Sequence, residues 1–264
     1  MLVLILIILI ILLLCIIWIT IIYKSNTING FSGKISLNDY SKIQLPKTKT
    51  EYQYLKDNLP IDFYYTDKIY VKHMKIILDR MERILKKHNI TYWAMFGTLL
   101  GIIRHDGFIP WDDDIDLGVL HNELEHILSL KEEFKKNNLD LYLHKTQRRE
   151  LLKVTYLNKP AELEKNVWID LFMYFKSKKD GYYHRTKGSY TKLKPSDLFP
   201  LKKHKFYDSY FPIPNNSIKI LDEQYGKNWD KEIVLNLHHK ITKKHKYNNY
   251  PEYNFKKPIS FANL

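Results

Sequence analysis

The chain has 264 residues and a formal net charge of +13 at pH 7. Its one cysteine, Cys15, lies in an apolar amino-terminal segment, which excludes a disulfide or a thiolate zinc site in the rest of the chain. Lys and Arg number 19 against 8 Asp and Glu in residues 176–264, but 22 against 21 in residues 25–175. The basic last third is compatible with binding of nucleotide diphosphates, anionic lipids or nucleic acid, and equally with a solvated lysine-rich surface.

The amino-terminal segment has the length and apolarity of a membrane span. Residues 2–22 contain no charged side chain, and an apolar helix of about 20 residues crosses a bilayer. The segment lacks the charged start and small-residue cleavage site of a signal peptide. We therefore expect residues 1–24 to be an uncleaved anchor and the protein to be a single-pass membrane protein, with a signal peptide that is cut later as the alternative.

The side of the membrane stays open on sequence grounds. Lysines follow the apolar segment, which favours a cytosolic domain. The sequons at Asn89 and Asn215 would be glycosylated only in a lumenal one. Residues 25–65 are polar and without sustained periodicity, so we expect a stalk there. We expect residues 66–264 to form the globular domain, a length sufficient for a substantial core.

Hydrophobic periodicity predicts alternating helices and strands after the stalk. Apolar residues at helical spacing indicate a helix over 67–88, and "ITYWAMF" indicates a strand over 90–96. A short helix over "GTLLGIIRH", a strand over "DIDLGVL" and a helix from Asn122 to about Lys136 follow. Three more strands are predicted over "LDLYLHK", "LLKVTYL" and "VWIDLFMYF". This order favours an α+β (mixed α/β) domain built on one sheet. Prolines interrupt the last 90 residues, where we expect loops and one helix over 217–225.

The segment "WDDDIDLG" places four carboxylates in five positions. In a strand, Asp112, Asp114 and Asp116 point to one face, and Asp113 points to the other. Crowded carboxylates repel one another when partly desolvated, and a divalent cation with oxygen ligands, such as magnesium, manganese or calcium, can neutralise them. An EF-hand loop fails because its sixth position would be Leu117, where a glycine is needed. A solvated acidic turn is the remaining alternative.

Two further features extend this cluster. Asp170 is a lone acid in the apolar strand "VWIDLFMYF", and it completes a metal-binding set if that strand lies beside "DIDLGV". Gly97 and Thr98 follow a strand and open a helix, where backbone N–H groups and a hydroxyl can bind phosphate. Thr98 could equally be an ordinary helix cap. Together these features indicate phosphoryl or nucleotidyl transfer.

The segment "FGTLLGIIRHDGFIPWDDDIDLGV" resembles the signature of the LicD family, which includes bacterial phosphorylcholine transferases and is similar to fukutin and fukutin-related protein. The segments "WIDLFMY" and "FPIPNNSIKILDEQYGKNW" extend the resemblance over about residues 70–230. The resemblance implies a nucleotidyltransferase fold related to polymerase beta. It also implies transfer of a phospho-alcohol from a CDP-activated donor to a sugar hydroxyl of a glycan or glycoconjugate.

The resemblance also implies roles for particular residues. Gly97 and Thr98 fall in the family's glycine motif, Asp112, Asp114 and Asp116 in its acidic motif, and Asp170 at its second-strand aspartate. The zinc-binding cysteines of the fukutin-related branch are absent.

From these positions we expect Asp114, Asp116 and Asp170 to hold Mg²⁺ or Mn²⁺, and Asp112 or Asp170 to orient or deprotonate the acceptor. Arg104, His105 and Lys153 are further candidates for contact with substrate.

Two other functions remain open. A membrane-anchored glycosyltransferase also combines an amino-terminal span with an Asp-X-Asp metal motif, although Gly97 and Thr98 ahead of the acidic strand argue against it. A catalytically inactive glycan-binding protein of the same fold is the second. A nucleic-acid partner is not expected, because an anchor would hold the domain away from its template.

Overall fold

The computed structural model describes residues 65–146, 150–186, 192–237 and 241–246. Within these ranges no helix is both long enough and apolar enough to cross a membrane. This finding corrects the expected membrane location. The predicted anchor over residues 1–24 and nearly all of the predicted stalk lie outside the described residues.

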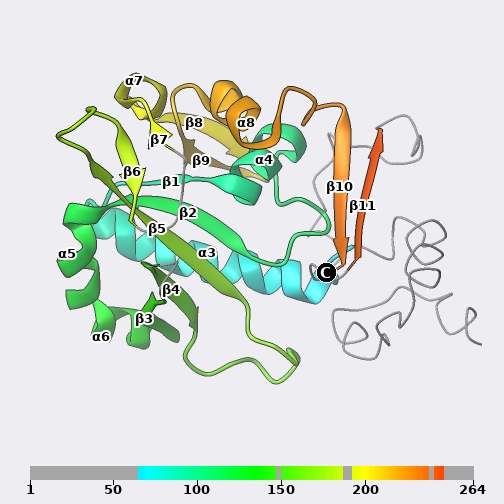
Figure 1. Ribbon diagram of the computed structural model, residues 1–264. Helices are drawn as coiled ribbons and strands as arrows, with labels where there is room; N and C mark the ends of the chain where they lie inside the picture. The colour runs from blue at the N-terminus through cyan, green and yellow to red at the C-terminus, as the bar shows by residue number, and fades with distance from the viewer. Residues whose placement is uncertain (1–64, 147–149, 187–191, 238–240, 247–264) are drawn as a thin grey trace, which may run out of the picture.

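A seven-stranded mixed sheet organises the domain. Its main strands run in the order β1 (Tyr92–Ala94), β2 (Ile115–Leu120), β5 (Trp168–Lys176), β4 (Glu150–Tyr156) and β3 (Leu139–Lys145). The two short strands β6 (Tyr183–Arg185) and β7 (Lys192–Leu193) extend from β5. Strands β2 and β5 are parallel, and the other pairs are antiparallel. The fold is therefore the predicted mixed α/β arrangement around one sheet (Figure 1).

Helix α3 (Lys68–Lys87) covers one face of the sheet (Figure 1). The Asp67 carboxylate caps its amino terminus by accepting from the Ile69 amide, and two lysines lie in its last turn, as its dipole favours. Its apolar stripe, including the fully buried Ile77 and Met81, packs on the core side of the strands. The other face is consequently left for polar side chains.

The remaining elements lie mainly at the two ends of the sheet (Figure 1). Residues after β2 form the short elements η3 (His121–Glu123), α5 (Leu124–Ser129) and α6 (Lys131–Lys136). Beyond the β1 edge lie α4 (Phe96–His105), α8 (Ser217–Tyr225) and the hairpin of β8 (Lys202–Phe206) and β9 (Ser209–Ile213). The chain also forms α7 (Pro195–Leu198) and the hairpin of β10 (Glu232–Leu237) and β11 (Ile241–Lys246).

Most of the predicted elements are confirmed, including the helix over 67–88 and the helix over 217–225. The helix predicted from Asn122 to Lys136 is wrong as a single element, because the chain breaks there into η3, α5 and α6. The prediction of loops over the rest of the last third is also wrong. Pro195 starts α7, where its missing N–H costs nothing, and Pro212 lies in β9, which pairs with β8 alone among the described strands.

Candidate metal and phosphate site

Asp116 and Asp170 are direct neighbours on the two parallel strands at the centre of the sheet. Residue 116 of β2 is in register with residue 170 of β5. Leu117 and Leu171, the next residue on each strand, are fully buried on the face toward α3. Because alternate side chains of a strand point to opposite faces, both aspartates lie on the face away from α3.

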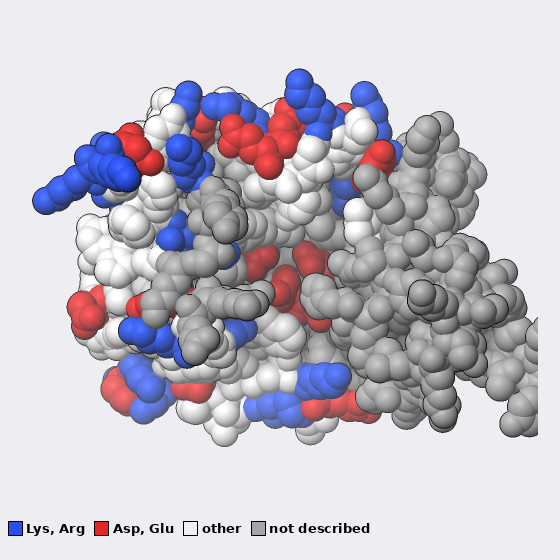
Figure 2. All heavy atoms as spheres, viewed as in Figure 1, with Lys and Arg blue, Asp and Glu red and all other residues white. Residues whose placement is uncertain are grey.

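The loop before β2 brings further acids to this pair. Carboxylate oxygens of Asp114, Asp116 and Asp170 lie within 4.8 Å of one another, as do those of Asp112, Asp113 and Asp114. Figure 2 shows acidic side chains gathered in a hollow near the middle of this face, over the region of β2 and β5. The prediction that Asp113 points away from its neighbours is wrong, because β2 begins only at Ile115 and strand alternation does not extend to residues 112–114.

Electrostatic crowding strongly affects these carboxyl groups. Burial, followed by the charges of Asp114, Asp116 and Asp113, raises the pKa of Asp112 well above its ordinary value. Burial and the charges of Asp114 and Asp170 likewise raise the pKa of Asp116, against the opposing effects of the Gly97 amide and the Lys153 ammonium. Such a cluster holds its negative charge only with a compensating cation. Three oxygen donors from two strands and a loop fit Mg²⁺ or Mn²⁺.

The first turn of α4 is part of the same site. The Gly97 amide donates a hydrogen bond to the Asp116 carboxylate. A Cβ atom on residue 97 would lie 2.7 Å from Oδ2 of Asp112, so any larger residue would force this carboxylate to move. Thr98 is 1% exposed, and its Oγ1 accepts from the Asp116 amide at 2.8 Å. In this conformation Thr98 therefore acts on the site by positioning Asp116.

Lys153 approaches the acids from the neighbouring strand β4. It is in register with Asp170, and its Nζ lies 2.6 Å from Asp170 Oδ1. The same ammonium lies 5.3 Å from the centroid of the Trp168 ring. Asp170 thus lies between the Lys153 ammonium, which attracts its carboxylate, and the carboxylates of Asp114 and Asp116, which repel it.

The structure gives Arg104 and His105 contacts of another kind. The Arg104 guanidinium donates from Nη1 to the backbone oxygens of Trp229 at 2.7 Å and Glu232 at 3.3 Å, which ties α4 to the start of β10. His105 is fully buried, accepts from Arg104 Nε at 3.0 Å and packs edge-on against Trp111. A fully buried imidazole cannot reach a ligand in this conformation, which corrects the expectation that His105 contacts substrate. These contacts give Arg104 a structural role, and its contact with substrate stays a prediction.

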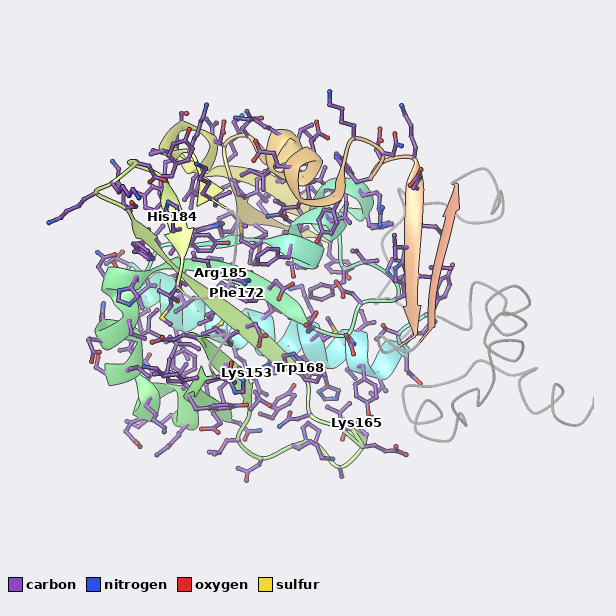
Figure 3. All side chains as sticks on the ribbon, in the orientation of Figure 1. Lys153, Lys165, Trp168, Phe172, His184 and Arg185 are labelled. Atoms are coloured by element: carbon purple, nitrogen blue, oxygen red, sulfur yellow. The ribbon has the colours of Figure 1, made fainter. Side chains whose placement is uncertain are left out.

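Sequence reasoning missed one cation beside the site. Arg185 of β6 lies opposite Tyr174 of β5, and its guanidinium lies 4.9 Å from the Phe172 ring centroid and 5.6 Å from that of Phe96. Phe172 shares the face of Asp170, and Phe96 directly precedes Gly97. Figure 3 shows Arg185 and Phe172 at one part of β5, with Lys153 and Trp168 farther along it. Alternation along β5 could have indicated Phe172 and Trp168, whereas a three-residue strand offers no pattern that would reveal Arg185.

Tyr225, the last residue of α8, also lies close to the acids. Burial of its phenol, followed by the charges of Asp112 and Asp116, raises the pKa of Tyr225, although part of its ring is exposed. In the sequence, Tyr225 stands within the family-like segment "FPIPNNSIKILDEQYGKNW" and has no other signal of a site residue. The acids are near enough for their charges to act on this phenol.

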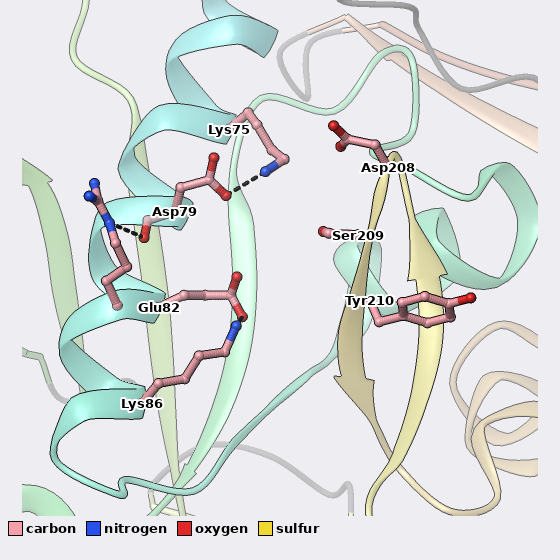
Figure 4. Close-up of a pocket in the computed structure, with 8 residues that line it drawn as sticks. Lys75, Asp79, Glu82, Lys86, Asp208, Ser209 and Tyr210 are labelled. Atoms are coloured by element: carbon pink, nitrogen blue, oxygen red, sulfur yellow. Dashed lines mark hydrogen bonds and ion pairs between the residues drawn. The ribbon is translucent and has the colours of Figure 1, made fainter.

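A second hollow lies apart from this site, between α3 and the β8–β9 hairpin (Figure 4). Four of its charged groups form ion pairs within α3, Lys75 with Asp79 and Lys86 with Glu82. It contains none of the predicted site residues. We interpret it as a solvated surface between two elements.

Comparison with known proteins identifies the domain that contains these acids. Residues 89–216 match the family described as "LicD/FKTN/FKRP, nucleotidyltransferase domain". These residues belong to the LicD family. The matched range contains the first turn of α4, the acidic loop, β2, β4 and β5, so it includes every residue of the carboxylate cluster.

Individual relatives agree with this assignment. An uncharacterized protein of Rickettsia prowazekii, RP689, is 31% identical over 162 residues, which cover 60% of this chain and 55% of that protein. The lipopolysaccharide cholinephosphotransferase LicD of Haemophilus influenzae is 43% identical over 54 residues, 20% of each chain. The mouse ribitol-5-phosphate transferase FKTN is 25% identical over 181 residues, 67% of this chain and 36% of that protein. The chain thus spans about half the length, or less, of these curated relatives.

Proposed function

We propose that this LicD-family domain transfers a phospho-alcohol, phosphocholine-like or phosphoribitol-like, from a CDP-activated donor to a sugar hydroxyl of a glycan or glycoconjugate. The observation that supports it most directly is the convergence of Asp114, Asp116 and Asp170 beside Gly97, inside the family's matched range. The names of two relatives, a cholinephosphotransferase and a ribitol-5-phosphate transferase, support the choice of transferred group. We place the core in the nucleotidyltransferase class related to polymerase beta.

In this proposal Asp114, Asp116 and Asp170 hold Mg²⁺ or Mn²⁺. When bound, the ion neutralises the donor diphosphate and the departing CMP. The acceptor oxygen forms a bond to the phosphorus that carries the alcohol, and the bond from that phosphorus to the CMP oxygen breaks. The proton of the acceptor hydroxyl passes to a carboxylate.

The residues around the acids have distinct tasks. Thr98 positions Asp116 by accepting a hydrogen bond from its backbone amide at 2.8 Å, and Lys153 positions Asp170 through the ion pair at 2.6 Å. The first turn of α4 and the stacked Arg185 guanidinium offer positive potential to the diphosphate. Asp112 is one candidate proton acceptor, because its carboxylate lies beside that of Asp114 and is not one of the three proposed metal ligands. Asp170 is the other, at the edge of the acids nearest β4.

The test is release of CMP by the full-length protein from CDP-choline, CDP-ribitol and CDP-glycerol, with Mn²⁺ or Mg²⁺ and then with EDTA. We expect metal-dependent release from one of these donors that Asp116→Asn abolishes. UDP-sugars are included in the same screen. Release of UDP from a UDP-sugar, with none of CMP, would replace the proposal with a glycosyltransferase. No reaction with any donor by the folded protein would favour an inactive glycan-binding protein.

A further inference from the structure

Two cation–aromatic pairs lie on either side of Asp170 along β5. Phe172 follows Asp170 by two residues and Trp168 precedes it by two, so all three side chains share one face. The strand rise places the two aromatic residues about 13 Å apart. Arg185 lies over Phe172 at 4.9 Å, and Lys153 lies over Trp168 at 5.3 Å (Figure 3).

The surroundings of the two pairs differ. Phe172 packs edge-on against Phe96, with ring centroids 5.0 Å apart, so the Arg185 pair is continuous with the first turn of α4. Trp168 is in register with Thr155 of β4, on the side of the sheet that leads to the outer strand β3. The first pair therefore lies toward the proposed donor phosphates, and the second lies away from them.

A row of polar side chains crosses the sheet from the outer strand β3 to the acids on β5 and β2. Tyr142 of β3, Lys153 of β4, Asp170 of β5 and Asp116 of β2 are successive register partners. Strand spacing places Tyr142 roughly 14 Å from Asp116 along this row. Tyr142 is 38% exposed, and the Lys153 side chain retains 20% exposure beside the acids. Tyr142 therefore presents an accessible ring on the same face of the sheet as the acids.

We propose that a sugar unit of the acceptor binds over Tyr142, Lys153 and Trp168, with its attacking hydroxyl at Asp170. This inference rests on the function proposed above. In-line displacement at phosphorus requires the nucleophile to enter opposite the leaving group. With the diphosphate on the side of α4 and Arg185, the acceptor must approach across β4 and β3. The C–H face of a pyranose packs on an aromatic ring, and its hydroxyls bond to ammonium and carboxylate groups.

Saturation-transfer difference NMR tests this surface without any catalytic step. The probes are the methyl glycosides of glucose, galactose, N-acetylglucosamine and N-acetylgalactosamine, added to the full-length protein. We expect transfer to at least one glycoside, reduced at least fivefold in Trp168→Ala and in Tyr142→Ser. Tyr142 lies on the outer strand and is partly exposed, so its variant tests the proposal even where Trp168→Ala does not fold.

Tyr210→Ala is the matched control, because Tyr210 is 67% exposed on β9, beyond the β1 edge. Its loss should leave the transfer unchanged. The proposal is overturned by the absence of transfer to every glycoside, by full transfer in both site variants, or by an equal reduction in Tyr210→Ala. Binding at Tyr142 and Trp168 without CMP release from any donor would retain this surface while rejecting the proposed reaction. Release of CMP without glycoside binding would support the proposed reaction and reject this acceptor surface.

Discussion

Asp116 and Asp170 lie side by side on the parallel strands β2 and β5, and the carboxylate of each contacts a different neighbour. The Asp116 carboxylate accepts from the Gly97 amide, whereas the Asp170 carboxylate pairs with the Lys153 ammonium. Both aspartates therefore have fixed positions before any ligand binds. Their mutual repulsion is the cost of this arrangement, and it is one of the causes that raise the pKa of Asp116.

Asp116→Asn should abolish metal-dependent transfer while stabilising the metal-free protein. Removal of one crowded charge relieves repulsion, so we expect a higher unfolding temperature without metal. Added Mn²⁺ should raise the unfolding temperature of the wild type but not of the variant. Transfer should fall at least about 10²- to 10³-fold, since the metal contributes several kcal/mol to the transition state.

Asp208→Asn is the matched control for this experiment. Asp208 is exposed in the turn between β8 and β9, away from the carboxylate cluster. Its substitution should change neither the response to Mn²⁺ nor the rate. A wild-type rate in Asp116→Asn would remove the metal role from this carboxylate.

Gly97→Ala should inactivate the site without unfolding the domain. Alanine favours a helical position over glycine by about 0.5–1 kcal/mol, so α4 itself should not be weakened. The new Cβ would lie 2.7 Å from Asp112 Oδ2, and the carboxylate must move to avoid it. We expect at least about a tenfold loss of transfer, the order that a small misplacement in an active site produces. A variant with wild-type rate and unchanged affinity for Mn²⁺ would contradict the proposed closeness of helix and acid.

Substitutions of Arg185 separate its charge from its stacking. Arg185→Ala should raise the KM for the CDP donor about tenfold, because a charge-assisted contact to phosphate is lost. Arg185→Lys retains the charge but loses the planar group over Phe172 and Phe96, so we expect an intermediate KM. Lys192→Ala is the control, since that ammonium lies over Tyr182, at 4.7 Å. An unchanged donor KM in both Arg185 variants would exclude contact with the diphosphate.

Local patterns predicted the face on which each acid lies, whereas the proximity of the two acids was expected only if their strands were neighbours. Ile115 and Leu117 alternate with Asp116, and Ile169 and Leu171 flank Asp170, so each strand shows its buried side and its polar side directly. The helix over 67–88 was predictable for the same reason, since its stripe and its cap both lie within the segment. Such signals need no knowledge of distant contacts.

The parts that failed depend on residues far along the chain. Trp111 donates from Nε1 to the backbone oxygen of Val234 at 2.9 Å, and Thr66 donates to that of Asp112 at 2.5 Å. These contacts hold residues 111–114 out of the strand, which changed the direction of Asp113. The Arg104 guanidinium likewise donates hydrogen bonds to backbone carbonyls at the start of β10. No local pattern predicts contacts of this kind, because tertiary structure overrides local propensity.

The buried end of α7 offers a test of stability that is independent of the site. Asp197 Oδ2 accepts from Lys219 Nζ at 2.6 Å, and Oδ1 accepts from Asn216 Nδ2 at 3.2 Å, which joins α7 to α8. Burial alone would raise the pKa of Asp197, but these two hydrogen bonds, with the charges of Lys219 and Lys194, outweigh it and hold the pKa below its usual 3.8. Asp197→Asn should lower the free energy of unfolding by about 1–2 kcal/mol at pH 7.

The pH dependence of this difference follows from the direction of the shift. A carboxylate with a lower pKa in the folded state stabilises the fold above its unfolded pKa and loses that contribution as pH falls through the folded pKa. The gap between wild type and Asp197→Asn in urea unfolding should therefore be constant near neutrality and shrink below about pH 4. Glu223→Gln is the control, because Glu223 is exposed and 4.0 Å from the same lysine. A gap that stayed constant into acid would mean that the Asp197 charge does not stabilise this junction.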